Sequence, residues 1–204
     1  EIQRVIIAHS LRKRGQEMLT GVGEPEAALE WKRKLRSFID TECIPLELQA
    51  DENDGQLPDE VKQKHRQAAR DMGLWLPNVP KEFGGAGLSA SEIVAVEEEV
   101  GRATNGVGFF FHDVSPFLVR TATPWQMETY VQPMLDGERN ECYAITEEGA
   151  GSDVDAIQAT ARKEGNGYVL SGLKWHVTGF NKADVIVFQA KLEDGQHGLF
   201  YVDR

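Results

Sequence analysis

Apolar residues in the first two thirds of the chain recur at spacings of three and four, the period of a helix that buries one face. The stretch after Pro25 shows this pattern, with basic residues between its apolar positions: Trp31, Leu35, Phe38 and Ile39. A second stretch, from Asp59 to Met72, repeats the pattern and stops at Gly73, a residue type that often ends helices. His65 has polar neighbours in that stretch, and we expect it to be exposed. The pattern predicts a helical domain over residues 26–140.

Two helix starts in this domain carry their own sequence signal. Ser89 is followed by Glu92, and Thr123 by Gln126, and both spacings are typical of capping boxes. Between these two starts, residues 105–122 are strongly apolar. We interpret this segment as a buried helix.

After residue 140 the hydrophobic period changes to two, which is typical of strands. Five segments show it: "ECYAIT", "AIQATARKE", "GYVLSGLKWHVTG", "DVIVFQAKL" and "GLFYVD". The turn signals "GNG" (165–167) and "EDG" (193–195) separate some of them. Because no helical segment lies between these strands, the sequence predicts an antiparallel sheet or barrel, and therefore an α+β fold class.

Composition and charge limit the classes of function. The 204 residues carry a net charge of −11, which argues against nucleic-acid binding because that function needs a basic surface. The only cysteines, Cys43 and Cys142, form no CxxC pair, which fits a soluble protein in a reducing compartment. No apolar run is long enough for a membrane span. The consecutive acids from Glu97 to Glu99 point around a helix, so no metal site is predicted.

The stretch "TEEGAGSD", from Thr146 to Asp153, is the main candidate for a binding site. Its glycines let backbone N–H groups approach an anion closely, and Ser152 adds a hydroxyl donor. It matches neither the P-loop nor the GxGxxG fingerprint, and by itself such a stretch is more often an ordinary loop. Further along, "SGLKWHVTG" carries a second threonine, Thr178. The two segments together could line a flat heteroaromatic cofactor and take its phosphate on the turn.

The motif "YAITEEGAGSD…YVLSGLKWHVTG", with "MGLWLPNVPKEFGGAGLS" and "MLDGERNECYAIT" before it, resembles the FAD-dependent acyl-CoA dehydrogenases. The resemblance covers residues 25–204. It implies a helical N-terminal domain over 26–140 and a β-barrel middle domain that begins at 141 and is incomplete at 204. It also implies a C-terminal helical bundle, which we expect to be absent here.

Carried over position by position, the resemblance assigns the FAD-binding residues. They are Tyr143, Ala144, Ile145, Thr146, Gly151, Ser152, His176, Val177 and Thr178. Thr146 would face the polar edge of the flavin, Gly151 and Ser152 the pyrophosphate, and Thr178 would lie near flavin N5. Ser152 would also contact the acyl-CoA substrate. The resemblance assigns no catalytic base to this chain and no metal ligand.

Two positions depart from the family pattern. Glu148 stands where proline is usual, a change confined to the turn. His176 stands where a tryptophan commonly packs beside the flavin, whereas Trp175 comes one residue early and would face the other side of a strand. We expect the change at His176 to affect the potential of the flavin and its electron acceptor, but not the fold.

The beginning of the chain, "EIQRVIIAHSLRKRGQ", resembles the last helix of the same family. On this interpretation residues 1–14 end a preceding dehydrogenase module, residues 15–25 are a linker, and the chain is an excerpt from a tandem dehydrogenase. The alternative is an ordinary amphipathic basic helix.

The reaction implied by the resemblance is α,β-dehydrogenation of an acyl-CoA, as in fatty-acid β-oxidation, with electron-transfer flavoprotein as the acceptor. We expect a homo-oligomer or a tandem-module assembly in the bacterial cytoplasm or the mitochondrial matrix. The 204 residues alone are expected to be inactive and to bind FAD poorly. Two alternatives stay open: an oxygen-using flavoenzyme (acyl-CoA oxidase or flavin monooxygenase), and a non-catalytic half that binds acyl-CoA or a partner subunit.

Overall fold

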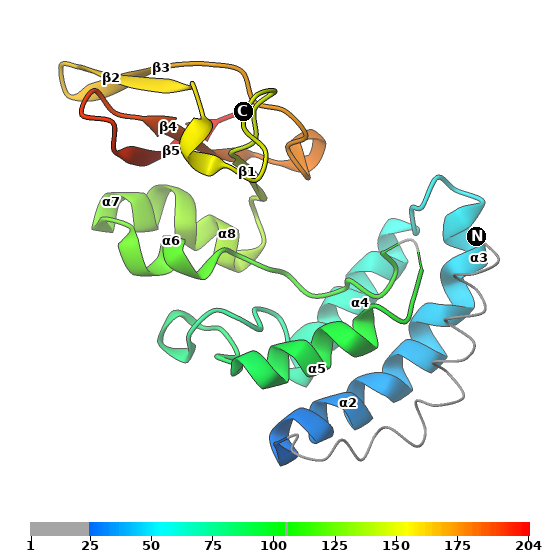
Figure 1. Cartoon of the computed structure of the whole chain (residues 1–204). Coiled ribbons are helices and arrows are strands. Elements are labelled where there is room, and N and C mark those ends of the chain that lie inside the picture. Colours follow the sequence, from blue (N-terminus) through cyan, green and yellow to red (C-terminus); the bar gives the residue numbers. More distant parts are fainter. Residues whose placement is uncertain (1–24, 105) are drawn as a thin grey trace. The chain divides into compact units, whose positions relative to one another are not determined.

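The computed structural model describes residues 25–104 and 106–204. The chain forms two compact units, the first ending at Asp113 and the second running from Val114 to Arg204 (Figure 1). Our expectations for residues 1–14, and for the linker up to residue 24, lie outside the described residues. The boundary between these two packed units lies before residue 140, where the sequence predicts the domain boundary. The predicted boundary at residue 140 stays a proposal.

The described part of the first unit is helical, as the hydrophobic period predicts. Its elements in chain order are α2 (Glu26–Phe38), the π-helical turn η1 (Ile39–Cys43), the 3-10 helix η2 (Ile44–Leu46), α3 (Glu47–Asp51), α4 (Asp59–Met72), the 3-10 helix η3 (Lys81–Phe83) and α5 (Ala90–Val100). The apolar face of α2 packs against α5, and Leu35, Ile39 and Val96 are almost completely buried in the shared core. Each such side chain contributes roughly 1.5–3 kcal/mol on burial.

A charged cluster also joins α2 to α5. Glu99 is only 2% exposed, and both of its carboxylate oxygens accept hydrogen bonds from Arg36. Arg102 donates to Glu99 at 3.1 Å and to Asp40 at 2.6 Å. Two guanidinium groups therefore compensate the buried carboxylate, which is a structural role. Among the described residues, no group of histidine, cysteine or acidic side chains could hold a metal ion.

The predicted helix ends are confirmed. Ser89 and Glu92 form a capping box at the start of α5, and Thr123 and Gln126 form another at the start of α7 (Pro124–Gln126). Gly73 ends α4 with a φ of 74°, a conformation that glycine adopts without steric cost.

His65 is buried, so the prediction that it is exposed is wrong. It is 4% exposed, and its ring lies edge-on to the rings of Phe38 and Phe110. The helical period explains this, because His65 shares one face of α4 with Val61 and Ala69, which pack into the same core. Burial lowers the pKa of His65.

The apolar segment 105–122 is not one helix, which corrects a second prediction. Residues 106–115 are irregular, and helix α6 covers only Pro116–Thr121. A Cβ atom at Gly108 would lie 2.2 Å from the carbonyl oxygen of Val100, so the chain passes very close to the end of α5. Phe109 is 58% exposed whereas Phe110 is 5% exposed, so only part of the segment is core.

The second unit combines short helices with a sheet. Its elements in chain order are α6, α7, the π-helical turn η4 (Met127–Val131), α8 (Gln132–Asp136), β1 (Glu141–Ala144), the 3-10 helix η5 (Val154–Ala156), β2 (Thr160–Glu164), β3 (Gly167–Ser171), the 3-10 helix η6 (Phe180–Lys182), β4 (Val185–Lys191) and β5 (His197–Asp203).

Helical segments followed by a sheet confirm the α+β class. The sheet is mixed, so the prediction of an antiparallel sheet is only partly right. β2 pairs with β3, and β4 with β5, as antiparallel hairpins whose turns lie where the sequence predicts them. β1 runs parallel to β4, and β2 meets the end of β4 through one parallel pair, Thr160 with Lys191. Long connections, not tight hairpins, return the chain to β4, and they permit parallel pairing. Within the described residues, the five strands form an open sheet that does not close on itself.

Strand pairing sorts the side chains of the sheet onto two faces. Tyr143 of β1 lies opposite Val187 of β4, so Tyr143 and Gln189 share one face, and Ala144 lies on the other. The short helices α6, α7 and α8 lie beside the sheet (Figure 1). They pack on the face of Tyr143, where Tyr130 of η4 stacks on Tyr201 of β5. The candidate residues of β1 therefore point to different sides of the sheet.

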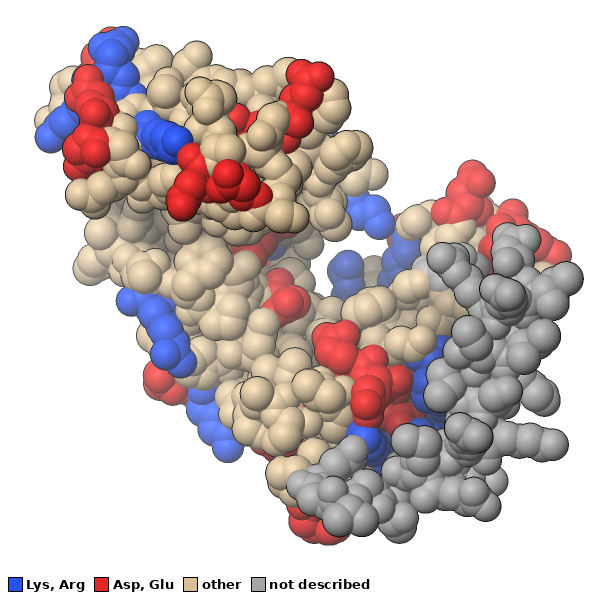
Figure 2. All heavy atoms as spheres, viewed as in Figure 1, with Lys and Arg blue, Asp and Glu red and all other residues tan. Residues whose placement is uncertain are grey.

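Two further observations concern membrane-spanning helices and surface charge. Within the described ranges, no helix has the length and apolar character that crossing a membrane would require. Figure 2 shows both acidic and basic side chains on the face in view.

Candidate functional site

The glycine-rich stretch after β1 forms a tight turn, as the sequence predicts. Two backbone hydrogen bonds of 3.1 Å close it, one from Glu147 N to Ala150 O and one from Ala150 N to Glu147 O. The turn therefore has a defined backbone in the structure.

Open space lies beside two glycines of this turn. A Cβ atom built at Gly149 or at Gly151 would meet no other atom within 4 Å, and neither residue has the positive φ that requires glycine. Ser152, which follows, is exposed. The described chain itself therefore does not require glycine at these two positions, whereas a ligand that lies close to the backbone would require it.

The second predicted segment lies beside the first. The backbone N–H of Trp175 donates to the carbonyl oxygen of Thr146 at 2.8 Å. This bond brings the segment that contains His176, Val177 and Thr178 next to the glycine turn. The structure thus unites the two stretches that carry the sequence motif.

The second segment is not a strand, which corrects the prediction. β3 ends at Ser171, and His176 has a φ of 49°, outside the extended region. Trp175 and His176 therefore do not lie on opposite sides of a strand. Their rings contact each other at 5.9 Å, and both residues are exposed.

A buried ion pair, which the sequence motif did not reveal as functional, supports both segments. Lys174 Nζ donates to a carboxylate oxygen of Glu147 at 2.8 Å and to the carbonyl oxygen of Ile145 at 2.9 Å. The side chains of Lys174 and Glu147 are 4% and 8% exposed. Glu147 also accepts hydrogen bonds from the backbone N–H groups of Gln158 and Ala159. We call these four hydrogen bonds the Glu147–Lys174 clamp.

The clamp joins three parts of the chain: the turn, the segment before β2 and the segment after β3. Its sequence signal is weak: a lone lysine in the apolar run "LSGLKWHV" and an acid directly before the turn. Burial by itself would raise the pKa of Glu147, but hydrogen bonds from Lys174, Gln158 and Ala159 outweigh it and lower the pKa.

The lowered pKa of Glu147 predicts acid sensitivity. A folded-state pKa below the unfolded value contributes stability at neutral pH that is lost as pH falls through the folded value. We therefore expect the denaturation midpoint of the wild-type chain to fall between pH 7 and pH values below about 4.3, the ordinary glutamate range. Glu147→Gln should start lower and fall less over this window. Denaturant titrations at several pH values measure both, and parallel curves for the two proteins would contradict the assignment.

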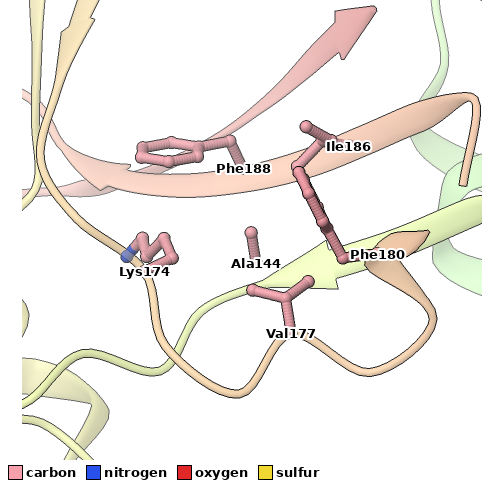
Figure 3. A pocket seen from close by; sticks show the side chains of 6 residues that line it. All are labelled: Ala144, Lys174, Val177, Phe180, Ile186 and Phe188. Carbon is pink, nitrogen blue, oxygen red and sulfur yellow. The ribbon is translucent and has the colours of Figure 1, made fainter. Parts of the chain in front are cut away.

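A cavity of about 370 Å³ lies on the other side of the sheet from Tyr143. The residues that line it, drawn in Figure 3, are Ala144, Lys174, Val177, Phe180, Ile186 and Phe188. Lys174 Nζ also lies 5.1 Å from the centre of the Phe188 ring. Of the predicted site residues, Ala144 and Val177 thus belong to this apolar cavity, whereas Tyr143, Ser152, His176 and Thr178 are exposed.

Comparison with known families confirms the resemblance in the motifs. The acyl-CoA dehydrogenase N-terminal domain matches residues 25–138, and the acyl-CoA dehydrogenase middle domain matches residues 142–204. Together these two matches cover most of the chain.

Individual proteins that are similar to this chain support the same family. The 3-(aryl)acrylate reductase of Clostridium sporogenes is 36% identical over 181 residues, which are 84% of this chain and 46% of that protein. The mitochondrial short-chain specific acyl-CoA dehydrogenase of Bos taurus is 31% identical over 178 residues, 85% of this chain and 42% of its own length. The chain thus spans about half the length of the curated relatives it matches.

The solved structure of one similar protein contains FAD. The acyl-CoA dehydrogenase from Bacillus anthracis, crystallised in complex with FAD, has a TM-score of 0.68 and 27% identity. The match covers 90% of this chain and 32% of that chain. The FAD prediction is confirmed at the level of relatives, which include bacterial and mitochondrial enzymes.

Proposed function

The chain belongs to the acyl-CoA dehydrogenase family, and we propose that the intact protein uses FAD to oxidise the α–β carbon bond of an acyl-CoA thioester. The substrate class rests on the family, and the assignment of FAD to particular residues rests on the site described above.

The observation that carries the proposal is the open space at Gly149 and Gly151 beside exposed hydroxyl groups. These residues fit FAD, because the turn offers N–H groups and Ser152 a hydroxyl to a diphosphate. Thr146 would hold the polar edge of the flavin, and the segment from His176 to Thr178 would hold its other side. FAD, when bound, supplies the hydride acceptor.

The residues of this chain would bind the cofactor and orient it relative to the substrate. The Glu147–Lys174 clamp and the bond from Trp175 N to Thr146 O fix the spacing between the two cofactor segments. Fixed spacing matters because hydride transfer needs the reacting atoms close together and aligned. Ser152 would contact both the pyrophosphate and the acyl-CoA.

Glu147 is not the base that removes the α proton. Both of its oxygens are engaged by Lys174, Gln158 and Ala159, and its pKa is lowered. A base needs an oxygen that can reach the proton it abstracts. No other described carboxylate is assigned this role.

Reduction of an α,β-unsaturated acyl thioester is a second candidate. The observation that favours it is the relative from Clostridium sporogenes, a 3-(aryl)acrylate reductase that matches 84% of this chain. The same alignment of substrate and flavin serves hydride transfer in either direction. Assays in both directions, with electron-transfer flavoprotein as the proposed partner, separate the two.

The proposal also covers setting and assembly. We place the protein in the bacterial cytoplasm or the mitochondrial matrix, as a homo-oligomer or tandem-module assembly. An acyl-CoA oxidase would consume oxygen and release peroxide, and a flavin monooxygenase would consume oxygen and transfer one oxygen atom to its product, whereas a dehydrogenase would reduce electron-transfer flavoprotein without consuming oxygen. A non-catalytic half would bind acyl-CoA without any change in the flavin spectrum.

Anaerobic addition of acyl-CoA to the FAD-loaded intact protein tests the function. We expect the visible flavin absorbance to bleach with one acyl-CoA class. The catalytic proposal would be removed if acyl-CoA does not bleach the oxidised FAD-loaded protein and enoyl-CoA does not reoxidise the chemically reduced one. The 204-residue chain tested in parallel should not turn over.

Gly151→Ala separates cofactor binding from folding. Because no protein atom lies near the added methyl group, we expect unchanged stability or a gain of up to about 1 kcal/mol. FAD affinity should fall by roughly tenfold or more, since the methyl group occupies the space at the pyrophosphate. Thermal unfolding without FAD and a fluorescence titration with FAD measure the two effects. Equal FAD affinity in the variant and the wild type would contradict the placement.

A further inference from the structure

A chain of polar contacts crosses the sheet on the face of Tyr143. The Tyr143 hydroxyl donates to Oε1 of Gln189, and Nε2 of Gln189 lies 2.7 Å from Nδ1 of His197. Nε2 of His197 lies 3.7 Å from a carboxylate oxygen of Asp155. Gln189 is 6% exposed, whereas the Asp155 side chain is 97% exposed. These polar contacts therefore run from an exposed carboxylate, through a buried amide, to the Tyr143 hydroxyl.

The direction of each hydrogen bond follows from the groups involved. A primary amide donates through nitrogen and accepts through oxygen, so Gln189 accepts from Tyr143 and donates to His197. Nδ1 of His197 must then be the acceptor, which is the neutral imidazole with its proton on Nε2, toward Asp155. In this state the proton of the Tyr143 hydroxyl points to Gln189.

Protonation of His197 is incompatible with this arrangement. An imidazolium has no acceptor nitrogen, so Nδ1–H would oppose the N–H of Gln189. The amide of Gln189 is buried, and losing its partners is costly, so turning the amide over is the favourable response. After this turn Oε1 accepts from His197 and Nε2 donates to the oxygen of Tyr143.

We propose that Gln189 and His197 are positioning residues for Tyr143, and that protonation of His197 reverses the hydrogen-bond direction of its hydroxyl. With His197 neutral, the hydroxyl donates into the sheet. With His197 protonated, the hydroxyl accepts from the sheet and its proton is free to donate toward the exposed side. This inference rests on the proposed function in one respect, the predicted contact of Tyr143 with FAD.

The surroundings support a switch that responds to pH. Asp155 of η5 faces Nε2 of His197, and Lys191 of β4, directly opposite His197 in the sheet, donates to the carbonyl oxygen of Asp155. One negative and one positive side chain thus flank the imidazole. Burial raises the pKa of Tyr143, so its hydroxyl keeps its proton wherever imidazole titrates.

The test follows Tyr143 and His197 in the same sample. The intact protein is labelled at tyrosine Cζ and histidine Cε1 with 13C, and both resonances are recorded without FAD from about pH 5 to 8, the range in which imidazole charge changes. Tyr143→Phe assigns the Tyr143 signal among the tyrosine resonances. We expect the Tyr143 resonance to shift in one step, with the midpoint of His197.

Variants at three residues make this test decisive. His197→Gln should abolish the step. Gln189→Leu should leave His197 titrating while the Tyr143 signal stays flat, and Gln189→Met repeats the comparison if the leucine variant does not fold. His112→Gln, a matched change in the other unit, should keep the step. A wild-type Tyr143 signal that ignores the His197 titration, or a step that persists in Gln189→Leu, would overturn the proposal.

FAD distinguishes this inference from the proposed function. In the FAD-loaded protein, the flavin absorbance should show the same midpoint, and the shift should disappear in Gln189→Leu. A protein that shows the coupled step but binds no FAD retains the switch and contradicts the proposed function. A flavin spectrum that does not follow the midpoint would mean that Tyr143 does not face FAD.

Discussion

Replacing Lys174 with methionine is expected to lower the free energy of unfolding at pH 7 by roughly 3–5 kcal/mol, the usual cost of removing one partner of a buried ion pair. Glu147 would stay 8% exposed without its cation, while the N–H groups of Gln158 and Ala159 still bind it. Denaturant titration of the intact protein measures the change. FAD affinity should fall with it, because Lys174 also holds the carbonyl oxygen of Ile145, beside Thr146.

The controls for Lys174 use the same chemical change elsewhere. Lys163 lies at an exposed position of β2. Lys163→Met should therefore change the free energy of unfolding by less than about 0.5 kcal/mol. The double variant Glu147→Gln, Lys174→Met should recover part of the loss, because the buried charge is gone. If Lys174→Met costs no more than Lys163→Met, the Glu147–Lys174 clamp does not support the site.

Gly172→Ala is expected to have the second large effect. Its added Cβ would lie 2.6 Å from the Cβ of Ala159, which is completely buried, and its φ of 153° is one that side chains rarely adopt. Overpacking costs about 1–3 kcal/mol and an unfavourable backbone conformation about 1–3 kcal/mol more. Because Ala159 N donates to Glu147, the displacement should also disturb the glycine turn.

Gly149→Ala is the matched control for Gly172→Ala. A Cβ at Gly149 meets nothing within 4 Å, so its stability should be unchanged or slightly higher. Thermal unfolding of the two variants gives the comparison directly. Equal melting temperatures would mean that the close approach of Gly172 to Ala159 does not restrain the fold.

The sequence predicts the fold class because its two hydrophobic periods are strong. Helix ends marked by Gly73, Ser89 and Thr123 are where the residues predict them, since each end depends only on neighbouring residues. Parallel pairing of β1 with β4 was missed, because it joins residues far apart in sequence that no local signal connects.

Buried polar groups were harder to predict than the elements that carry them. His65 has polar neighbours, yet the helical period turns it into the core. Lys174 and Gln189 lie in stretches that look like plain strand, and their buried partners are contributed by other elements. Such partners follow from tertiary packing, which single-sequence patterns do not encode.

The candidate site was predicted as two stretches, and the structure brings them together through Trp175 N and Thr146 O. The extended conformation assumed for the second stretch was wrong, because Gly172 and His176 both adopt positive φ values. The predicted roles of Thr146, Gly151, Ser152 and Thr178 toward FAD stay predictions.

Hydrogen exchange of the intact protein with and without FAD shows whether the two segments hold the cofactor. We expect FAD to bind and to slow exchange of the backbone N–H groups from Glu147 to Ser152 and from His176 to Thr178, with the effect on the turn weakened in Gly151→Ala. A folded protein that binds FAD without protecting the turn, or that binds no FAD at all, would contradict the proposed cofactor site.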